Sequence, residues 1–246
     1  MKAVAGALIG ALAAGPVLAQ QPEAWTAQTA DDLTLAYAVF PEGIAVIARC
    51  QAGTPELLIQ GLQIRMPTID VAARFGDGRA HWGSWMPSEN GRYLIAERPT
   101  QLMRGFVNTR TAMLQFGEGD GAVQFTVTPP ADTSGMEGVL TACGQPLFHE
   151  RDEAEPLRLS AGGDDFLREG RVIIPPRAAR DRVSGWAYVT CMTAEGGRLT
   201  DCEAEAESPA GYGYGEASVR SLEESRIRGE VPPGRLVSIR LTTLVN

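Results

Sequence analysis

The sequence predicts an α+β protein of two domains, in which a β-rich, sandwich-like domain precedes a smaller α+β domain. Short alternating runs separated by turn residues fill residues 22–148, and such runs are typical of strands. Residues 171–246 show helix and strand patterns in the order α-β-β-α-β, which predicts a three-stranded antiparallel sheet with helices on one face. Between them, residues 149–170 contain ten charged residues, which indicates a charged linker.

The first 19 residues have the pattern of a signal peptide. Lys2 precedes an apolar run from Ala3 to Ala14, and the small-residue end Val17-Leu18-Ala19 follows a Gly-Pro break. The run is short for a membrane span, so we expect cleavage after Ala19 and a periplasmic or secreted protein. The alternative is an uncleaved N-terminus that anchors the protein in the inner membrane, facing the periplasm.

The composition argues against a nucleic-acid-binding protein. The net charge is −8, and Lys2 is the one lysine of the chain. Proteins that bind nucleic acid gather basic residues on one surface, whereas the arginines here are scattered.

The N-terminal domain is expected to consist mainly of strands. The expected strands are Leu33–Val39, Gly43–Cys50, Glu56–Gln60, Tyr93–Ala96, Ala112–Phe116 and Ala122–Val127. Two helices are expected at Thr100–Val107 and Thr133–Ala142, the second behind an Asp or Thr N-cap.

The C-terminal domain is expected to begin with a proline-started helix and to end with a strand. Its expected elements are the helix Pro175–Val183, the strands Trp186–Met192 and Leu199–Glu207, the helix Gly215–Arg226 and the strand Leu236–Leu244. Gly196-Gly197 predicts a two-residue hairpin turn, which would place Thr193 opposite Thr200 and Cys191 opposite Cys202.

Directly opposed residues of an antiparallel pair lie close enough for a disulfide, so we expect a Cys191–Cys202 bridge. A zinc site is the rival, but it needs more ligands than the nearby sequence offers. The remaining Cys50 and Cys143 then form the second pair, although four cysteines allow three connectivities. We expect no metal and no cofactor.

Residue types alternate along the two strands of the hairpin, which predicts one face of small apolar side chains and one face of acidic side chains. The first contains Ala187, Val189, Cys191, Cys202, Ala204 and Ala206. The second contains Asp201, Glu203, Glu205 and Glu207, and we expect these four acidic residues to face water.

Residues 171–246 resemble the C-terminal domain of the TonB energy-transducer family. Pro175, Ala178 and Gly185 match the opening frame of that family, with Ile174 in place of its tyrosine. The hairpin AYVTCMTAEGGRLTDCEAEAESP and the final strand LVSIRLTTLV match in order. The second helix matches at Tyr214, Ala217, Ser218, Val219 and Leu222.

The resemblance implies a protein-binding domain of the cell envelope that adds an extended segment of a partner, such as an outer-membrane receptor, to its sheet edge. The edge expected here is Leu236, Val237, Ser238, Ile239, Arg240 and Leu241. A second copy of the chain is the other occupant of this edge. No Pro-rich spacer precedes residue 170, so we expect binding without energy transduction. An accessory energy transducer for transport across the outer membrane, anchored by an uncleaved N-terminus, is the alternative.

No catalytic set stands out, and we expect a protein that is not an enzyme. His81 lies near Ser84, but the pair lacks the surroundings of a nucleophile elbow. His149 is expected to be a solvated side chain of the linker. The run GYGYG at 211–215 precedes a helix without the Lys-Ser/Thr of a phosphate loop, so we interpret it as a strand-to-helix connection.

Overall fold

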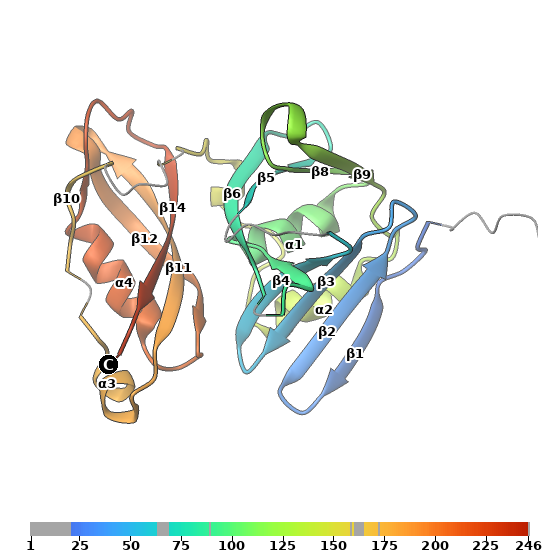
Figure 1. Ribbon diagram of the computed structural model, residues 1–246, viewed down its shortest axis with the longest axis horizontal. Helices are drawn as coiled ribbons and strands as arrows, with labels where there is room; N and C mark the ends of the chain where they lie inside the picture. Colours follow the sequence, from blue (N-terminus) through green and yellow to red (C-terminus); the bar gives the residue numbers. More distant parts are fainter. Residues whose placement is uncertain are drawn as a thin grey trace, which may run out of the picture.

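The computed structural model describes residues 21–62, 69–88, 90–157, 159, 165–171 and 173–245. The predicted signal peptide lies outside these residues. Within them, no helix has the length and apolarity that crossing a membrane requires. The described chain forms two lobes side by side, each built around its own sheet (Figure 1).

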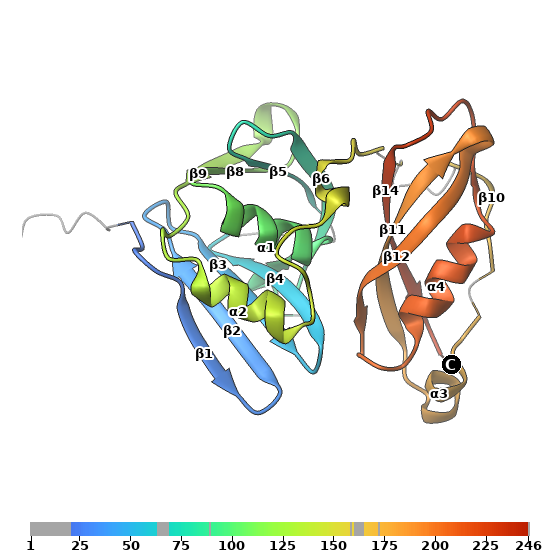
Figure 2. The same cartoon turned by 180° about the vertical axis from the view of Figure 1, so that it is seen from behind.

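The N-terminal lobe contains one nine-stranded sheet in the order β1-β2-β3-β4-β7-β6-β5-β8-β9, and all neighbours are antiparallel. Its strands are β1 (Thr26–Ala30), β2 (Leu33–Val39), β3 (Ala45–Gln51), β4 (Thr54–Gln60), β5 (Ile69–Phe75), β6 (Ala80–Pro87), β7 (Tyr93–Ile95), β8 (Ala112–Phe116) and β9 (Val123–Val127). The sheet curls around the helices α1 (Pro99–Asn108) and α2 (Ser134–Ala142), as Figures 1 and 2 show. A short 3-10 turn, η1 (Gly119–Gly121), joins β8 to β9.

The core of this lobe lies between the concave side of the sheet and the two helices. Alternate residues of β3 point inward, so that Val46, Ala48 and Cys50 are buried. The rings of Trp25 and Phe106 meet edge to face at 5.7 Å within the same cluster.

The predicted sandwich-like fold is wrong, because the N-terminal lobe has one curled sheet and not two packed ones. The helices α1 and α2 cover the apolar face that a second sheet would cover in a sandwich. The sequence interpretation also missed β1, β5 and β6. Three consecutive residues of β5, Val71–Ala73, are buried, so this strand lacks the alternation that identifies a half-exposed strand.

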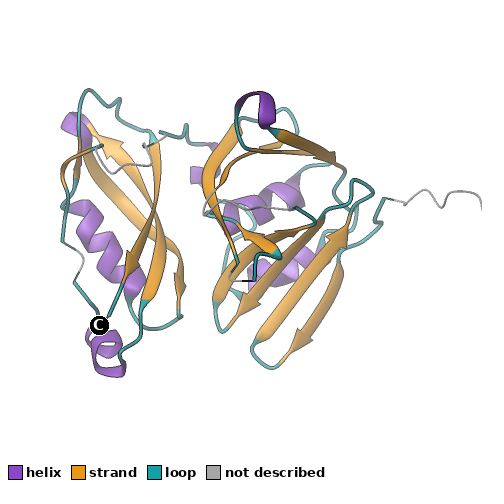
Figure 3. Ribbon diagram, viewed as in Figure 1, coloured by secondary structure: helices purple, strands orange, loops and turns teal. Residues whose placement is uncertain are grey.

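The C-terminal lobe contains a five-stranded antiparallel sheet in the order β10-β13-β12-β11-β14, so the predicted three-stranded sheet is also wrong. Its elements are β10 (Phe166–Arg168), α3 (Pro176–Asp181), β11 (Gly185–Ala194), β12 (Arg198–Ser208), α4 (Tyr214–Glu223), β13 (Arg226–Ile227) and β14 (Leu236–Thr243). The two unexpected strands are short. One of them, β10, lies within the segment predicted as a linker, which also contains the 3-10 turn η2 (Glu150–Glu153). Strands dominate both lobes (Figure 3).

The β11–β12 hairpin turns through three residues and not through two. Glu195–Gly197 forms a 3-10 turn, η3, and Thr193 therefore pairs with Leu199 where Thr200 was predicted. Gly197 is needed here, because its φ is +72° and a Cβ would lie 2.4 Å from the carbonyl oxygen of Ile227. The register shifts again between Thr190 and Met192.

Both predicted disulfides are present. Cys50 in β3 bonds to Cys143 at the end of α2, and Cys191 bonds to Cys202 across the hairpin at a Cα separation of 4.1 Å. Two disulfides in one chain indicate an oxidising, extracytoplasmic environment.

Candidate functional site

Strand β14 forms one edge of the five-stranded sheet, because it pairs with β11 on one side only. All six residues predicted for the edge, from Leu236 to Leu241, lie in this strand. Val237 is buried, and Ile239 and Leu241 pack against the core of the C-terminal lobe. The apolar alternation fixes which face of β14 turns inward, and the edge position leaves backbone groups without a strand to pair with.

The backbone groups that point away from β11 belong to every second residue. Both groups of Leu236 point outward, since its N–H donates to the oxygen of Glu155 at 2.9 Å and its oxygen accepts from the N–H of Leu157 at 2.8 Å. By the two-residue period of a strand, Ser238, Arg240 and Thr242 point the same way. Among the described residues, no backbone partner covers these three positions.

The sheet face that carries Ser238 and Arg240 lies against the N-terminal lobe. Ser238 Oγ donates to Glu97 Oε1 at 3.2 Å, and Arg240 donates to the sulfur of Met86. The Arg240 guanidinium also lies 5.0 Å from the ring centre of Trp186 in β11. Burial raises the pKa of Tyr188 in the same strand, which fits a covered face.

The acidic stripe of β12 was predicted to face water, and this prediction is confirmed for Asp201 and Glu203, which are exposed, but wrong for Glu205. Glu205 lies between the lobes, where Arg98 Nη2 donates to it at 3.1 Å and Thr100 Oγ1 donates at 3.0 Å. Its side chain is 10% exposed. Acidic residues at alternate positions occur both in strands that face solvent and in strands that face a charged surface of another segment. The sequence pattern therefore does not distinguish these two cases for Glu205, and the tertiary structure does.

Glu207, at the end of the same stripe, accepts hydrogen bonds from backbone N–H groups of the glycine-rich run at 211–215. Its Oε1 accepts from Gly211 at 2.6 Å, and its Oε2 accepts from Gly215 at 2.7 Å at the start of α4. The run at 211–215 is therefore a strand-to-helix connection, as expected, whose amides hold a carboxylate of the protein itself.

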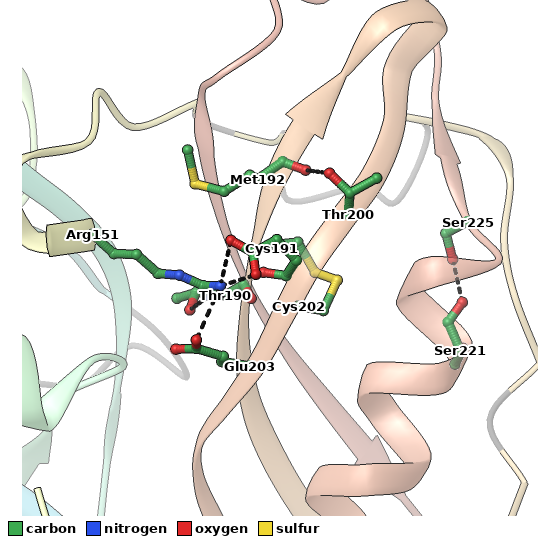
Figure 4. Close-up of a disulfide and its surroundings, with 10 residues drawn as sticks. Arg151, Thr190, Cys191, Met192, Thr200, Cys202, Glu203, Ser221 and Ser225 are labelled. Atoms are coloured by element: carbon green, nitrogen blue, oxygen red, sulfur yellow. Dashed lines mark hydrogen bonds and ion pairs between the residues drawn. A yellow bond between two sulfur atoms is a disulfide. The ribbon is translucent and has the colours of Figure 1, made fainter. Parts of the chain in front are cut away.

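Arg151 of η2 joins the linker to the hairpin at its disulfide (Figure 4). Its Nη1 donates to both oxygens of Thr190 at 3.1 Å, and its Nη2 lies 3.2 Å from Glu203. The neighbouring residue Asp152 accepts two bonds from Arg104 of α1, at 2.5 and 2.8 Å. The turn η2 is thus bonded to both lobes by adjacent side chains.

The histidines lie in separate hydrogen-bonded sites. His81 Nδ1 is 2.8 Å from Gln101 Nε2, and burial together with the charge of Arg98 lowers the pKa of His81. His149 was predicted to be solvated, but its Nδ1 accepts from Arg151 N and its Nε2 lies 3.2 Å from Glu203. Trp85, near His81 in sequence, is buried and packs edge to face on Phe116. In the described part of the chain, these contacts hold the side chains of His81, His149 and Trp85 in the folded structure.

A groove of about 560 Å³ runs along the seam between the linker, β12 and α4. Its lining includes Pro146, His149, Cys202, Val219 and Arg220. Cys202 of the hairpin disulfide thus borders this groove, whereas Cys191 is fully buried.

Fold and site together define a strand-rich, disulfide-bonded extracytoplasmic protein whose second sheet has an edge strand with outward backbone groups. No family model matches the chain, and no curated protein matches it.

Proposed function

We propose that this protein is a non-catalytic binding protein of the cell envelope, exported to the periplasm, which binds an extended segment of a partner protein along β14. The observation that carries the proposal is the row of outward backbone groups at Ser238, Arg240 and Thr242 in an edge strand. An extended chain placed beside these groups exchanges main-chain hydrogen bonds with them, which is how β-augmentation works.

The sequence resemblance to the TonB C-terminal domain supports the same proposal. In that family a receptor segment adds to the sheet edge, and the strand of this chain that aligns with the family's final strand is β14. The predicted signal peptide and the two disulfides are consistent with a partner in the envelope.

Thr242→Pro tests the binding mode. Thr242 is exposed and its N–H points outward, so proline removes a donor from the edge and leaves the ladder with β11 intact. Thr242→Val is the matched control, because it keeps the N–H and the branched side chain.

A photo-crosslinking residue at the exposed position Leu244 reports the occupant in cells. We expect an adduct with another envelope protein in the wild type and in Thr242→Val, and loss of that adduct in Thr242→Pro. Adducts that persist in Thr242→Pro would reject strand addition. Adducts that contain only a second copy of the chain would reject a foreign partner.

Export is tested by the N-terminus of the native protein. A soluble periplasmic chain that begins at Gln20 is expected, whereas a chain that keeps Met1 and remains with the inner membrane would reject cleavage and favour an anchored protein.

A further inference from the structure

Part of the β14 edge is already occupied by the chain itself. Residues Glu155–Leu157, which we name the linker strand, run parallel to the start of β14, with Pro156 opposite Leu236. The two hydrogen bonds of this bridge use the oxygen of Glu155 and the N–H of Leu157. Pro156 has no N–H, and the bridge requires none from it, so the proline costs no bond here.

The side chains of the linker strand are bound as well as its backbone. Glu155 Oε2 lies 2.5 Å from Arg235 Nη1, and Arg235 is only 28% exposed. The Nε of Arg235 is buried without a partner among the described residues. Two residues further along, Leu157 packs against the core of the C-terminal lobe, and so does Leu159.

This arrangement has the parts of a peptide-recognition site. The edge supplies main-chain bonds, a basic side chain binds one acidic residue, and apolar positions at a two-residue spacing meet the core. The linker strand fills these positions in the order acidic, proline, apolar, with Leu159 as the second apolar residue.

We propose that the linker strand is a built-in ligand of the β14 edge, and that the partner is an extended segment of the same chemistry which displaces it. The partner segment runs parallel to β14, places a carboxylate at Arg235 and places apolar residues where Leu157 and Leu159 lie. This inference rests on the proposed function, because it names the partner of that same edge.

The competition has a direct consequence for affinity. A tethered segment has a high effective concentration at its site, so it reduces the apparent affinity of any segment that needs the same groups. Weakening the contacts of the linker strand must therefore strengthen the binding of an added segment.

The test uses the full chain and a labelled synthetic peptide with the sequence of residues 153–161, EAEPLRLSA. Glu155→Gln with Leu157→Ser in the protein removes the ion pair and the apolar contact of the linker strand, but it leaves β14 unchanged. We expect the peptide to bind this double variant about tenfold or more tightly than it binds the wild type. Adding Arg235→Gln to the double variant is expected to abolish the gain.

A peptide that carries Gln and Ser at the positions of Glu155 and Leu157 is the matched control, and it is expected to bind neither protein.

Hydrogen exchange at the Leu236 amide reports the release of the linker strand without an added ligand. This N–H is expected to exchange faster in the double variant, and the wild-type peptide is expected to slow it again. Leu157→Ala alone is the milder variant if the double variant folds poorly, with the same expected directions.

The inference would be overturned if the wild type and the double variant bound the peptide equally and the exchange rate of the Leu236 N–H were the same in both. Thr242 lies outside the linker-strand contacts, so the crosslinking experiment is independent of this result. A partner adduct at Leu244 without peptide binding would overturn only this inference. Peptide binding without any partner adduct would reject the proposed function and, with it, the assignment of the partner.

Discussion

Arg98 at the start of α1 and Glu205 in the middle of β12 form an ion pair between the lobes, with Nη2 and Oε1 3.1 Å apart. The two side chains are 8% and 10% exposed, so water screens the pair little. Thr100 adds a hydrogen bond to the same carboxylate. The pair thereby buries Glu205 in the middle of β12, whereas Asp201 and Glu203 of the same strand stay exposed.

Breaking this pair is expected to destabilise the protein strongly. Arg98→Ala or Glu205→Ala leaves one buried charge without its partner, which costs about 3–5 kcal/mol in comparable pairs. Urea unfolding followed by tryptophan fluorescence measures the loss. Glu216→Ala, at a side chain that is 83% exposed, is the control and should change little. A small effect for both members of the pair would show that the lobes are held together by other contacts.

The carboxylate of Glu205 should also make the stability fall in acid. Burial disfavours its charged form, but Arg98, Thr100 and Arg104 together outweigh burial, and the pKa of Glu205 lies below its usual value. A lowered folded-state pKa stabilises the fold above the unfolded value of about 4.3, and this contribution disappears as the pH falls further. Glu205→Gln should show a shallower loss of stability below pH ~4.3 than the wild type, and parallel curves would contradict the assignment.

His81 is expected to produce a second decline at higher pH. Because its folded-state pKa is lowered, the unfolded chain takes up a proton below about pH 6.5 that folded His81 does not bind. Stability therefore decreases as the pH falls through that region. His81→Gln, which retains a polar side chain near Gln101, should remove this part of the pH dependence in chemical unfolding between pH 7 and 5. Identical slopes in the two proteins would be evidence against it.

Removing the hairpin disulfide should destabilise the C-terminal lobe moderately. Cys191 and Cys202 are separated by 11 positions, and closing so short a loop contributes ~2–3 kcal/mol through the unfolded chain. The double variant Cys191→Ser with Cys202→Ser avoids a free thiol. Its thermal midpoint should be lower than that of the oxidised wild type and insensitive to a reductant that leaves Cys50–Cys143 intact. A wild-type midpoint that is the same with and without reductant would contradict a stabilising role.

Gly185→Ala should disrupt the packing between β11 and α4. A Cβ at this position would lie 2.2 Å from the ring of Tyr214 and 2.6 Å from the carbonyl oxygen of Ser208. Tyr214 cannot move freely, because it is buried and donates a hydrogen bond to the oxygen of Val183. We expect a loss of about 1–3 kcal/mol or more. Gly138→Ala in α2 is the control, since a Cβ there has open space and a helical position gains ~0.5–1 kcal/mol.

The site was predicted in part from the sequence. The alternation of Val237, Ile239 and Leu241 identified the last strand, and chain order alone favoured an edge position for it. The linker strand was not foreseen, because Glu155–Leu157 has no periodicity of its own and a proline argues against a strand. Its contacts are with Arg235 and Leu236, which lie about 80 positions away in the sequence.

Local signals by themselves determined much of this protein. Cysteine spacing predicted the Cys191–Cys202 disulfide, and turn residues and apolar periods located most strands and the helices α1, α2, α3 and α4. These features depend on neighbours in the chain, so the sequence contains their physical cause. The tertiary structure decided what covers each face. Whether Glu205 meets water or Arg98, and whether a helix or a second sheet covers the apolar side of β3, depends on segments a hundred residues apart, because burial is a property of the assembled chain.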